Sequence, residues 1–429
     1  MVVRRLKEYL REGHGPVMER LVIHGGHPLF GTVKISGSKK SVLALVSAAL
    51  LANKPCIIEN APKVWDINRY LTFLRRLGVR SQYQGESTLI VDPTRILNRK
   101  ISLKLDGFPS SSLYLFGALL GRYQQFSIEK PSFSIDPFLK GFDALGVKVK
   151  QLDQYLYFTA PKLSGNMIYL DSSDPALAIN LMLAAIRAKG TTVLKNAPKD
   201  PELVDLAMFL SAMGAKIRGA GTDTIRIEGT HYLGGCRHTA IPDRMEAGIY
   251  MILAAATHGR IQVDQIIPHH LKSVSAKLRE MGVEISEGAE TIIVSGAKND
   301  HYSSIDIKAL PYPGFPIDLE QPFLTLLTQA KGTSLVTGHL SSNHFPLVDL
   351  LKKMGANIKI VGQSIMIQGA TQLIGQEIFI HEPSSAAALL VAALISSNQT
   401  TLIGYEALEK NYDQMLGKVM KLGAAIQTE

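Results

Sequence analysis

The sequence predicts an α/β protein of two lobes, built from six copies of one βαβαββ unit. In each copy, a helix ending in Leu-Gly or Met-Gly precedes a strand, and the glycine recurs as Gly78, Gly146, Gly214, Gly282, Gly355 and Gly423. These glycines are 68, 68, 68, 73 and 68 residues apart. A period this regular is typical of a repeated supersecondary unit.

Each unit also contains an earlier helix that is rich in alanine and leucine. The six segments are KKSVLALVSAALLAN, SSSLYLFGALLGR, DPALAINLMLAAIRAKG, DRMEAGIYMILAAATHG, DLEQPFLTLLTQAKG and SSAAALLVAALISSN. Because they are apolar on nearly all sides, we expect these helices to be buried. β-branched runs such as TTVLKN follow as strands, and the recurrent glycine then ends the second helix in a left-handed conformation.

The length of the chain predicts more than one hydrophobic core. A chain of 429 residues is too long for one ordinary core. Three units around shared buried helices make one lobe, so six units predict two. Helix N-termini then gather on one side of each lobe, where their free N–H groups and dipoles favour an anionic ligand between the lobes.

Composition narrows the class of protein and of ligand. Hydrophobic residues make up 46% of the chain and charged residues 19%, which is typical of a well-packed soluble protein. Cys56 and Cys236 have no CxxC partners, which fits a reducing cytoplasm, so we expect a cytoplasmic protein. The formal charge of +9 is scattered, with no basic helix or zinc-finger spacing. It therefore favours an anionic small molecule over nucleic acid.

Other sequence features predict neither a membrane span nor a metal site. No apolar run approaches twenty residues. His269 and His270 lack further ligands at metal-binding spacing, so we expect no metal. Residues 1–17 lack the apolar core of a secretory signal and are interpreted as an N-terminal extension, either a simple tail or a basic helix at a membrane surface.

Four segments resemble the enolpyruvyl transferase family, and within it the UDP-N-acetylglucosamine 1-carboxyvinyltransferases of peptidoglycan synthesis. They are MERLVIHGGHPLFGTVKISGSKKSVLALVSAALLA, PELVDLAMFLSAMGAKIRGAGTDTIRIEG, IPDRMEAG and PYPGFPIDLEQPFLTLL. The resemblance runs from about Met18 to the C-terminus. It implies two inside-out α/β barrels, with the first strand of the chain completing the second lobe.

The resemblance also implies domain limits and a reaction. The first lobe would comprise residues 39–240, and the second lobe residues 18–38 and 241–429. The family reaction adds the enolpyruvyl group of phosphoenolpyruvate to the 3-hydroxyl of UDP-N-acetylglucosamine and releases phosphate. It uses no metal or other cofactor.

Several site residues follow from the same resemblance. Lys39 matches the active-site lysine, and Asp318 matches the aspartate beside the sugar hydroxyl, so both are candidate catalytic residues. Asp243 and Arg244 match a hinge segment and are candidate substrate-binding residues. From the residues alone, Lys39 can also be interpreted as the solvated start of a helix, and Asp318 as a helix N-cap.

The chain departs from the family pattern at the residues that bind phosphoenolpyruvate. The loop cysteine is missing from SIEKPSFSIDPFLKGF, where Phe133 stands near an arginine position. Lys40 replaces an asparagine, and four further arginine positions hold Ser110, His344, Ser384 and Gln414. We expect Lys40, Ser110, His344 and Ser384 to line the substrate site instead. On the nucleotide side, Asp174 and Pro175 oppose diphosphate binding at a helix start.

The magnitude of these losses decides between functions. Removing four or five charge-assisted hydrogen bonds to a desolvated anion costs roughly 8–12 kcal/mol if the terms add. The sequence therefore predicts a divergent transferase that acts on an anionic or nucleotide-sugar-like ligand in the cleft. The alternatives are a non-catalytic paralogue that binds a ligand or a protein, and the unmodified family reaction.

Overall fold

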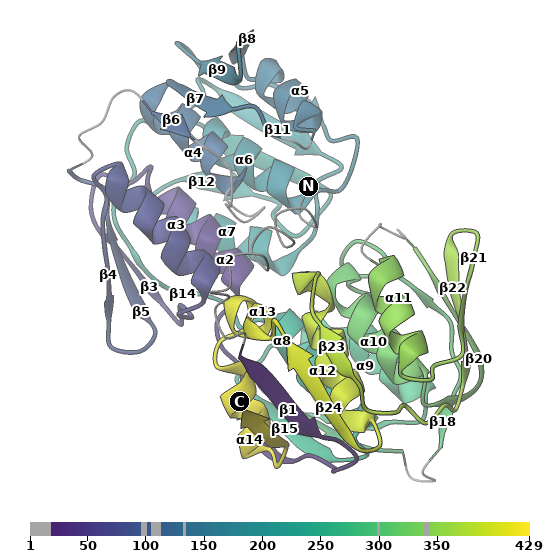
Figure 1. Ribbon diagram of the computed structural model, residues 1–429. Helices are drawn as coiled ribbons and strands as arrows, with labels where there is room; N and C mark the ends of the chain where they lie inside the picture. Colours follow the sequence, from purple (N-terminus) through teal and green to yellow (C-terminus); the bar gives the residue numbers. More distant parts are fainter. Residues whose placement is uncertain (1–18, 96–100, 104–112, 132–133, 298–300, 339–343) are drawn as a thin grey trace.

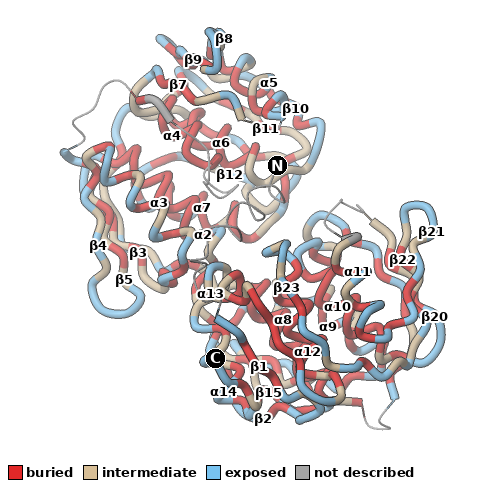
Figure 2. Tube along the Cα trace, in the orientation of Figure 1, coloured by how far each residue is buried: buried red, intermediate tan, exposed pale blue. Residues whose placement is uncertain are grey.

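The computed structural model describes residues 19–95, 101–103, 113–131, 134–297, 301–338 and 344–429. These residues form two bodies that meet at a narrow junction (Figure 1). We call them the first lobe, around the buried residues from Val42 to Ala240, and the second lobe, around those of 21–35 and 245–426. Each lobe has its own hydrophobic core, which follows the helices in its interior (Figure 2).

The described strands form six sheets, three in each lobe. In the strand orders given below, the first two strands of every sheet are parallel to each other. The third strand is antiparallel to the second, and the fourth is antiparallel to the third. This order recurs although the strands come from different parts of the chain.

The sheets of the first lobe have the orders β14 (Arg237–Thr239), β3 (Cys56–Glu59), β5 (Thr88–Asp92), β4 (Arg80–Gln84); β6 (Ser102–Leu103), β7 (Gln125–Glu129), β9 (Tyr155–Thr159), β8 (Lys148–Leu152); and β10 (Met167–Tyr169), β11 (Thr191–Lys195), β13 (Thr224–Glu228), β12 (Lys216–Arg218). In the second lobe, one sheet has the order β2 (Phe30–Lys34), β15 (Arg260–Asp264), β17 (Thr291–Ser295), β16 (Glu284–Glu287). The next has the order β18 (Tyr302–Ser303), β20 (Ala330–Thr337), β22 (Ser364–Gly369), β21 (Ile358–Val361). The last has the order β23 (Glu377–Phe379), β24 (Gln399–Ile403), β1 (Arg20–His24), β25 (Ala425–Thr428). A short strand, β19 (Ile307–Lys308), also pairs with β20.

Three apolar helices fill each lobe, and their predicted burial is confirmed. They are α2 (Lys39–Ala49), α4 (Leu115–Tyr123) and α6 (Pro175–Ala185) in the first lobe, and α8 (Arg244–Ala256), α10 (Glu320–Leu327) and α12 (Ala386–Ile395) in the second. All of α8 and α10 is buried, because both helices are surrounded by other elements of the lobe. No helix in the described ranges is long and apolar enough to span a membrane.

The remaining helices complete the lobes. They are α3 (Trp65–Arg76), α5 (Asp136–Ala144) and α7 (Pro201–Ala212) in the first lobe, and α9 (Lys272–Glu280), α11 (His344–Lys353), α13 (Glu406–Asn411) and α14 (Met415–Lys421) in the second. Three 3₁₀ turns, η2 (Pro268–Leu271), η3 (Ile317–Leu319) and η4 (Pro383–Ser385), precede α9, α10 and α12. The six recurrent glycines follow helices and have φ between 86° and 107°, so the predicted left-handed conformation is confirmed.

The N-terminal strand β1 belongs to the sheet that also contains the last strand of the chain. It lies between β24 and β25 and pairs antiparallel with both, with Val22 opposite Thr401 on one side and Gln427 on the other. Leu21 and Ile23 point into the second core. The chain must therefore leave the second lobe after β2, build the whole first lobe, and return.

The two crossings between the lobes lie side by side. The Ser38 N–H donates to the Ile241 carbonyl at 2.7 Å, and the Asp243 N–H donates to the Ser36 carbonyl at 2.8 Å. Gly37 lies between these bonds, and a Cβ there would sit 1.6 Å from the Asn60 carbonyl oxygen. Only glycine permits so close an approach of the Asn60 backbone to the first crossing.

Because β1 lies inside the last sheet, removing one of its buried side chains should destabilise the second lobe. We expect Ile23→Ala to lower the free energy of unfolding by about 2–5 kcal/mol, since Ile23 is fully buried. The neighbouring exposed residue provides the control, because His24→Ala removes no core contact. Urea unfolding followed by circular dichroism measures both variants. Equal midpoints for the two would contradict the role given to β1.

Candidate functional site

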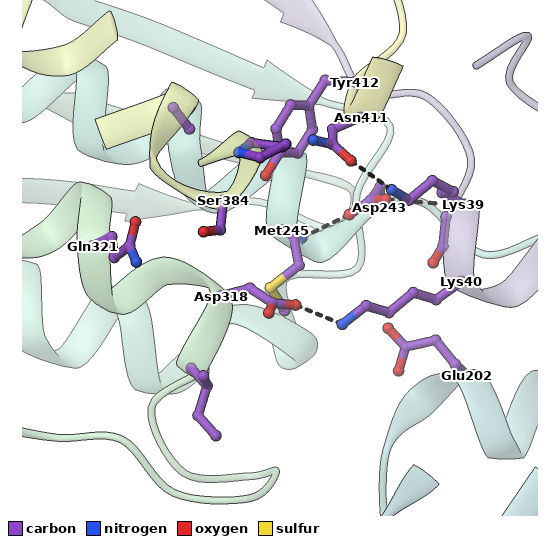
Figure 3. Close-up of a pocket in the computed structure, with 14 residues that line it drawn as sticks. Lys39, Lys40, Glu202, Asp243, Met245, Asp318, Gln321, Ser384, Asn411 and Tyr412 are labelled. Carbon is purple, nitrogen blue, oxygen red and sulfur yellow. Dashed lines mark hydrogen bonds and ion pairs between the residues drawn. The ribbon is translucent and has the colours of Figure 1, made fainter. Parts of the chain in front are cut away.

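A pocket of about 420 Å³ lies between the lobes, where several helices begin (Figure 3). The first lobe contributes Ser38, Lys39 and Lys40 at the start of α2, and Glu202 in the first turn of α7. The second lobe contributes Asp243, Met245, Ile317, Asp318, Gln321, Pro383, Ser384, Ala387, Asn411 and Tyr412. Most of these come from the first turns of α8, α10 and α12 and the 3₁₀ turns before them, so the N-termini of helices surround the pocket.

Lys39 joins three elements at the junction of the lobes. Its Nζ atom donates to Asp66 Oδ2 of α3 at 2.8 Å and to Asn411 Oδ1 at the end of α13 at 2.9 Å. Its backbone N–H donates to Asp243 Oδ2 at 3.3 Å. Asp66, which balances the charge of Lys39, belongs to the same lobe. Asp243, which accepts the backbone N–H of Lys39, belongs to the other lobe.

Lys40 and Asp318 form an ion pair across the pocket (Figure 3), with 2.5 Å between Nζ and Oδ2. The charge of Lys40 holds the pKa of Asp318 below its ordinary value, although burial acts in the opposite direction. The charge of Asp318 raises the pKa of Lys40 in turn. Each side chain is 46% exposed, so water screens the pair and it contributes little to stability.

Asp243 is the N-cap of α8. Its Oδ1 accepts hydrogen bonds from the backbone N–H groups of Met245 at 2.8 Å and Glu246 at 3.1 Å. Its other oxygen accepts the Lys39 N–H. Asp243 therefore fixes the starts of α8 and α2 relative to each other, in addition to lining the pocket.

Arg244 does not line the pocket, because its guanidinium points to the first lobe. Nη2 lies 3.0 Å from Asp200 Oδ1, and Nε lies 3.1 Å from Glu202 Oε1. The group also stacks over the Tyr312 ring, 5.2 Å from its centroid. Only 8% of the Arg244 side chain is exposed. It is a buried interlobe ion pair, and its predicted contact with substrate stays a prediction.

A second buried charge cluster lies behind the pocket. Glu246 accepts from Lys418 Nζ at 2.5 Å and from the Ser36 N–H at 3.1 Å. Burial raises the pKa of Glu246 to about 7, against the opposing effect of Lys418. Lys418 Nζ also donates to the Ser36 hydroxyl at 2.8 Å. This cluster ties α8 and α14 to the first crossing between the lobes.

The remaining predicted site residues have different outcomes. Ser384 lines the pocket, as do Lys39, Lys40, Asp243 and Asp318. Ser110 and Phe133 lie outside the described residues, and only the backbone of His344, at the start of α11, is described. Gln414 precedes α14 and is absent from the lining.

The lining of the pocket carries little positive charge. Its described residues include two lysines and three carboxylates, Glu202, Asp243 and Asp318, so the formal sum is +2 − 3 = −1. No arginine is among them. In the described part of the chain, no group of three or more His, Cys, Asp or Glu side chains is placed to hold a metal ion.

Comparison with known proteins decides the family. Residues 23–419 match the family described as EPSP synthase (3-phosphoshikimate 1-carboxyvinyltransferase). This chain belongs to the enolpyruvyl transferase family. The resemblance inferred from the sequence motifs is thereby confirmed.

Relatives and solved structures place the chain within this family. UDP-N-acetylglucosamine 1-carboxyvinyltransferase 2 of Geobacillus kaustophilus is 42% identical over 418 residues, covering 96% of this chain and 97% of that protein. The Bacillus subtilis protein of the same name is also 42% identical, over 419 residues. The enolpyruvyl transferase NikO of Streptomyces tendae superposes with a TM-score of 0.87 at 26% identity, covering 96% of this chain and 99% of that one.

A more distant structure shows how far the fold extends. EPSP synthase of Acinetobacter baumannii superposes with a TM-score of 0.77 at 18% identity and covers 96% of this chain and 100% of that one. The mixed α/β fold is therefore that of enolpyruvyl transferase structures.

Sequence reasoning missed the partners of the charged residues. Nothing in the sequence pairs Lys39 with Asp66 and Asn411, or Arg244 with Asp200 and Glu202. The sequence did contain one signal, an acid in the first turn of α7, where negative charge stabilises the start of a helix. That signal does not show that a cation of the other lobe lies beside the acid.

The buried position of Arg244 predicts a large effect on stability. Arg244→Met leaves Asp200 and Glu202 without their partner, so we expect a loss of about 3–5 kcal/mol in the free energy of unfolding. Arg279→Met is the control, because the Arg279–Glu287 pair is largely exposed and is worth less than about 1 kcal/mol. Urea denaturation compares the two. Equal losses would show that the Arg244 cluster is not buried as described.

The Lys40–Asp318 pair predicts a pH effect of defined sign. In the native chain its contribution is present above the pKa of a free aspartate, about 3.9, and is lost as pH falls through the lowered folded value. Lys40→Asn should raise the pKa of Asp318. Carbon-13 NMR titration of the aspartate carboxyl groups measures it, with Asp318→Asn to assign the signal and the remote Lys34→Asn as control. An unchanged titration in Lys40→Asn would contradict the pairing.

Proposed function

We propose that this chain is a divergent enolpyruvyl-type transferase whose interlobe pocket binds a nucleotide-sugar-like ligand. The observation that carries the proposal is the charge of the pocket, where both lysines are already paired and no described lining residue is an arginine. The ligand class is supported by the relatives, which are named for UDP-N-acetylglucosamine.

The unmodified family reaction is opposed by this charge distribution. Phosphoenolpyruvate carries both a phosphate and a carboxylate, and tight binding of two such groups calls for several guanidinium groups. Ser384 lines the pocket where the resemblance places one of them. Each missing charge-assisted hydrogen bond removes about 2–3 kcal/mol from binding or from the transition state. A donor or acceptor of lower charge fits the pocket better.

A sugar hydroxyl fits the polar groups that remain. Lys40 favours the charged form of Asp318, so its carboxylate can accept a hydrogen bond from a hydroxyl group. The Gln321 Oε1 atom is buried and has no hydrogen-bond partner among the described residues. It offers a second acceptor on the same wall of the pocket. Lys39 is placed to stabilise negative charge that develops on the ligand.

We also propose that the six sheets are copies of one βαβαββ unit arranged as two inside-out barrels. The recurrence of strand order and direction in all six supports this. The corresponding lobes would be residues 39–240 and residues 18–38 with 241–429, and the two separate cores support that division.

The proposal predicts ligand binding with greatly reduced phosphate release. With phosphoenolpyruvate and UDP-N-acetylglucosamine, we expect release at least about 100-fold slower than by the Geobacillus kaustophilus relative, since one lost bond of ~2–3 kcal/mol already costs about two orders of magnitude. UDP-N-acetylglucosamine should still raise the melting temperature. Lys39→Ala should abolish that rise, and the exposed Lys162→Ala should leave it intact.

The outcomes separate the three functions. Release within about tenfold of the relative would establish the unmodified reaction and contradict the proposed divergence. Stabilisation by UDP-N-acetylglucosamine, without a new product by mass spectrometry from any enolpyruvyl or acyl donor, would favour a non-catalytic binding protein. No stabilisation by UDP-N-acetylglucosamine, UDP or a sugar phosphate would contradict the ligand class.

A further inference from the structure

The two cysteines of the chain meet across neighbouring strands of the first lobe. β14 runs parallel to β3, with Arg237 opposite Ile57 (Figure 1). Cys236 precedes Arg237, and its carbonyl accepts a hydrogen bond from the Ile57 N–H at 2.8 Å. Extending this register by one position places Cys236 directly beside Cys56. Residues 180 positions apart are thus brought together by strand pairing (236 − 56 = 180).

The geometry of this contact is that of a disulfide-forming pair. Adjacent strands lie about 4.7–4.9 Å apart, within the roughly 4.4–6.8 Å that separates the Cα atoms of bonded cysteines. In register on parallel strands, the two side chains point to the same face of the sheet. The proximity of the two thiols lowers the pKa of Cys56 and raises that of Cys236.

Access differs between the two thiols. Cys56 is fully buried, whereas Cys236 is partly exposed. The residue before Cys236 is Gly235, where a Cβ would lie 2.0 Å from the Pro55 carbonyl oxygen. This close backbone approach fixes the start of β14 against the residue that precedes Cys56. A reagent in solution therefore reaches Cys236 first and finds Cys56 already in place.

We propose that Cys56 and Cys236 form a reversible disulfide when the chain meets a low-molecular-weight disulfide such as oxidised glutathione. Cys236 Sγ loses its proton to water and attacks one sulfur of the reagent, and a glutathione thiolate leaves. Cys56 Sγ then loses its own proton to water and attacks Cys236 Sγ, and the second glutathione leaves as a thiolate that, like the first, takes up a proton from water. The two protein thiols are oxidised, and one disulfide is reduced to two thiols.

The bond would secure the start of a short edge strand. β14 has three residues, lies at the edge of its sheet, and leads directly into the second crossing between the lobes. Side-chain contacts hold the residues after Cys236: His238 Nε2 lies 2.7 Å from Asp205 Oδ1, and Arg237 and Thr239 donate to the Glu59 carboxylate of β3. A covalent link at Cys236 would hold the start of β14 to β3. It would also restrict the unfolded chain, because it closes a long loop.

The test uses the full-length purified chain and oxidised glutathione. After treatment, we expect both cysteines to resist alkylation under denaturing conditions, and the intact mass to fall by two hydrogen atoms without a glutathione adduct. Peptide mapping should show a Cys56–Cys236 link. The melting temperature should rise on oxidation and return to its starting value with dithiothreitol.

Two variants make the result specific. Cys56→Ala should give only a glutathione adduct at Cys236, and Cys236→Ala should stay unmodified because Cys56 is buried. Neither should gain stability on oxidation. Two alkylatable cysteines in the treated native chain, or a stable adduct at Cys236 beside a free Cys56, would overturn the proposal. None of these readouts depends on the ligand of the pocket, so the result is independent of the proposed function.

Discussion

The pairing of β1 with β24 and β25 determines where the site lies. A first strand built into the last sheet forces the chain to cross between the lobes twice. The two crossings bond to each other through the backbones of Ser36 and Ser38 with Asp243 and Ile241. α2 and α8 therefore start at one point, from opposite lobes. The contact between the Lys39 amide and the Asp243 carboxylate is a direct consequence of that topology.

The contacts between the lobes differ in strength according to their burial. Arg244 with Asp200 and Glu202 is desolvated, so separating these groups leaves buried charges without partners. Lys40 and Asp318 are half exposed, so water replaces each partner at low cost when they separate. The lobes are thus held firmly by the Arg244 cluster and weakly by the Lys40–Asp318 pair. This arrangement suits a pocket in which the exposed pair can separate to admit a ligand while the buried cluster stays intact.

Local patterns predicted the features that depend on neighbouring residues. The recurrent glycines have positive φ because a helix ends at each of them, and the alanine-rich helices are buried because no face of them is polar. Lys39 and Asp318 were placed in the pocket through family motifs. Charge partners such as Asp66 for Lys39 were not predictable, because an ion pair depends on how whole elements pack. The same holds for Arg244, whose partners in α7 belong to the other lobe.

Family membership and the chemistry of the pocket are fixed by different residues. An identity of 42% over 418 residues shows the family and the fold, whereas the chemistry of a site depends on its own side chains. The pocket depends on a few side chains whose charges sum to −1, with each lysine paired to an acid of the chain itself. A dianionic group can bind there only by displacing an acid from Lys39 or Lys40 and leaving that acid uncompensated. A sugar hydroxyl accepts from a lysine and donates to Asp318 without changing the charge balance, which is why the sugar of the proposed ligand fits beside these charged side chains better than the phosphate or carboxylate of phosphoenolpyruvate.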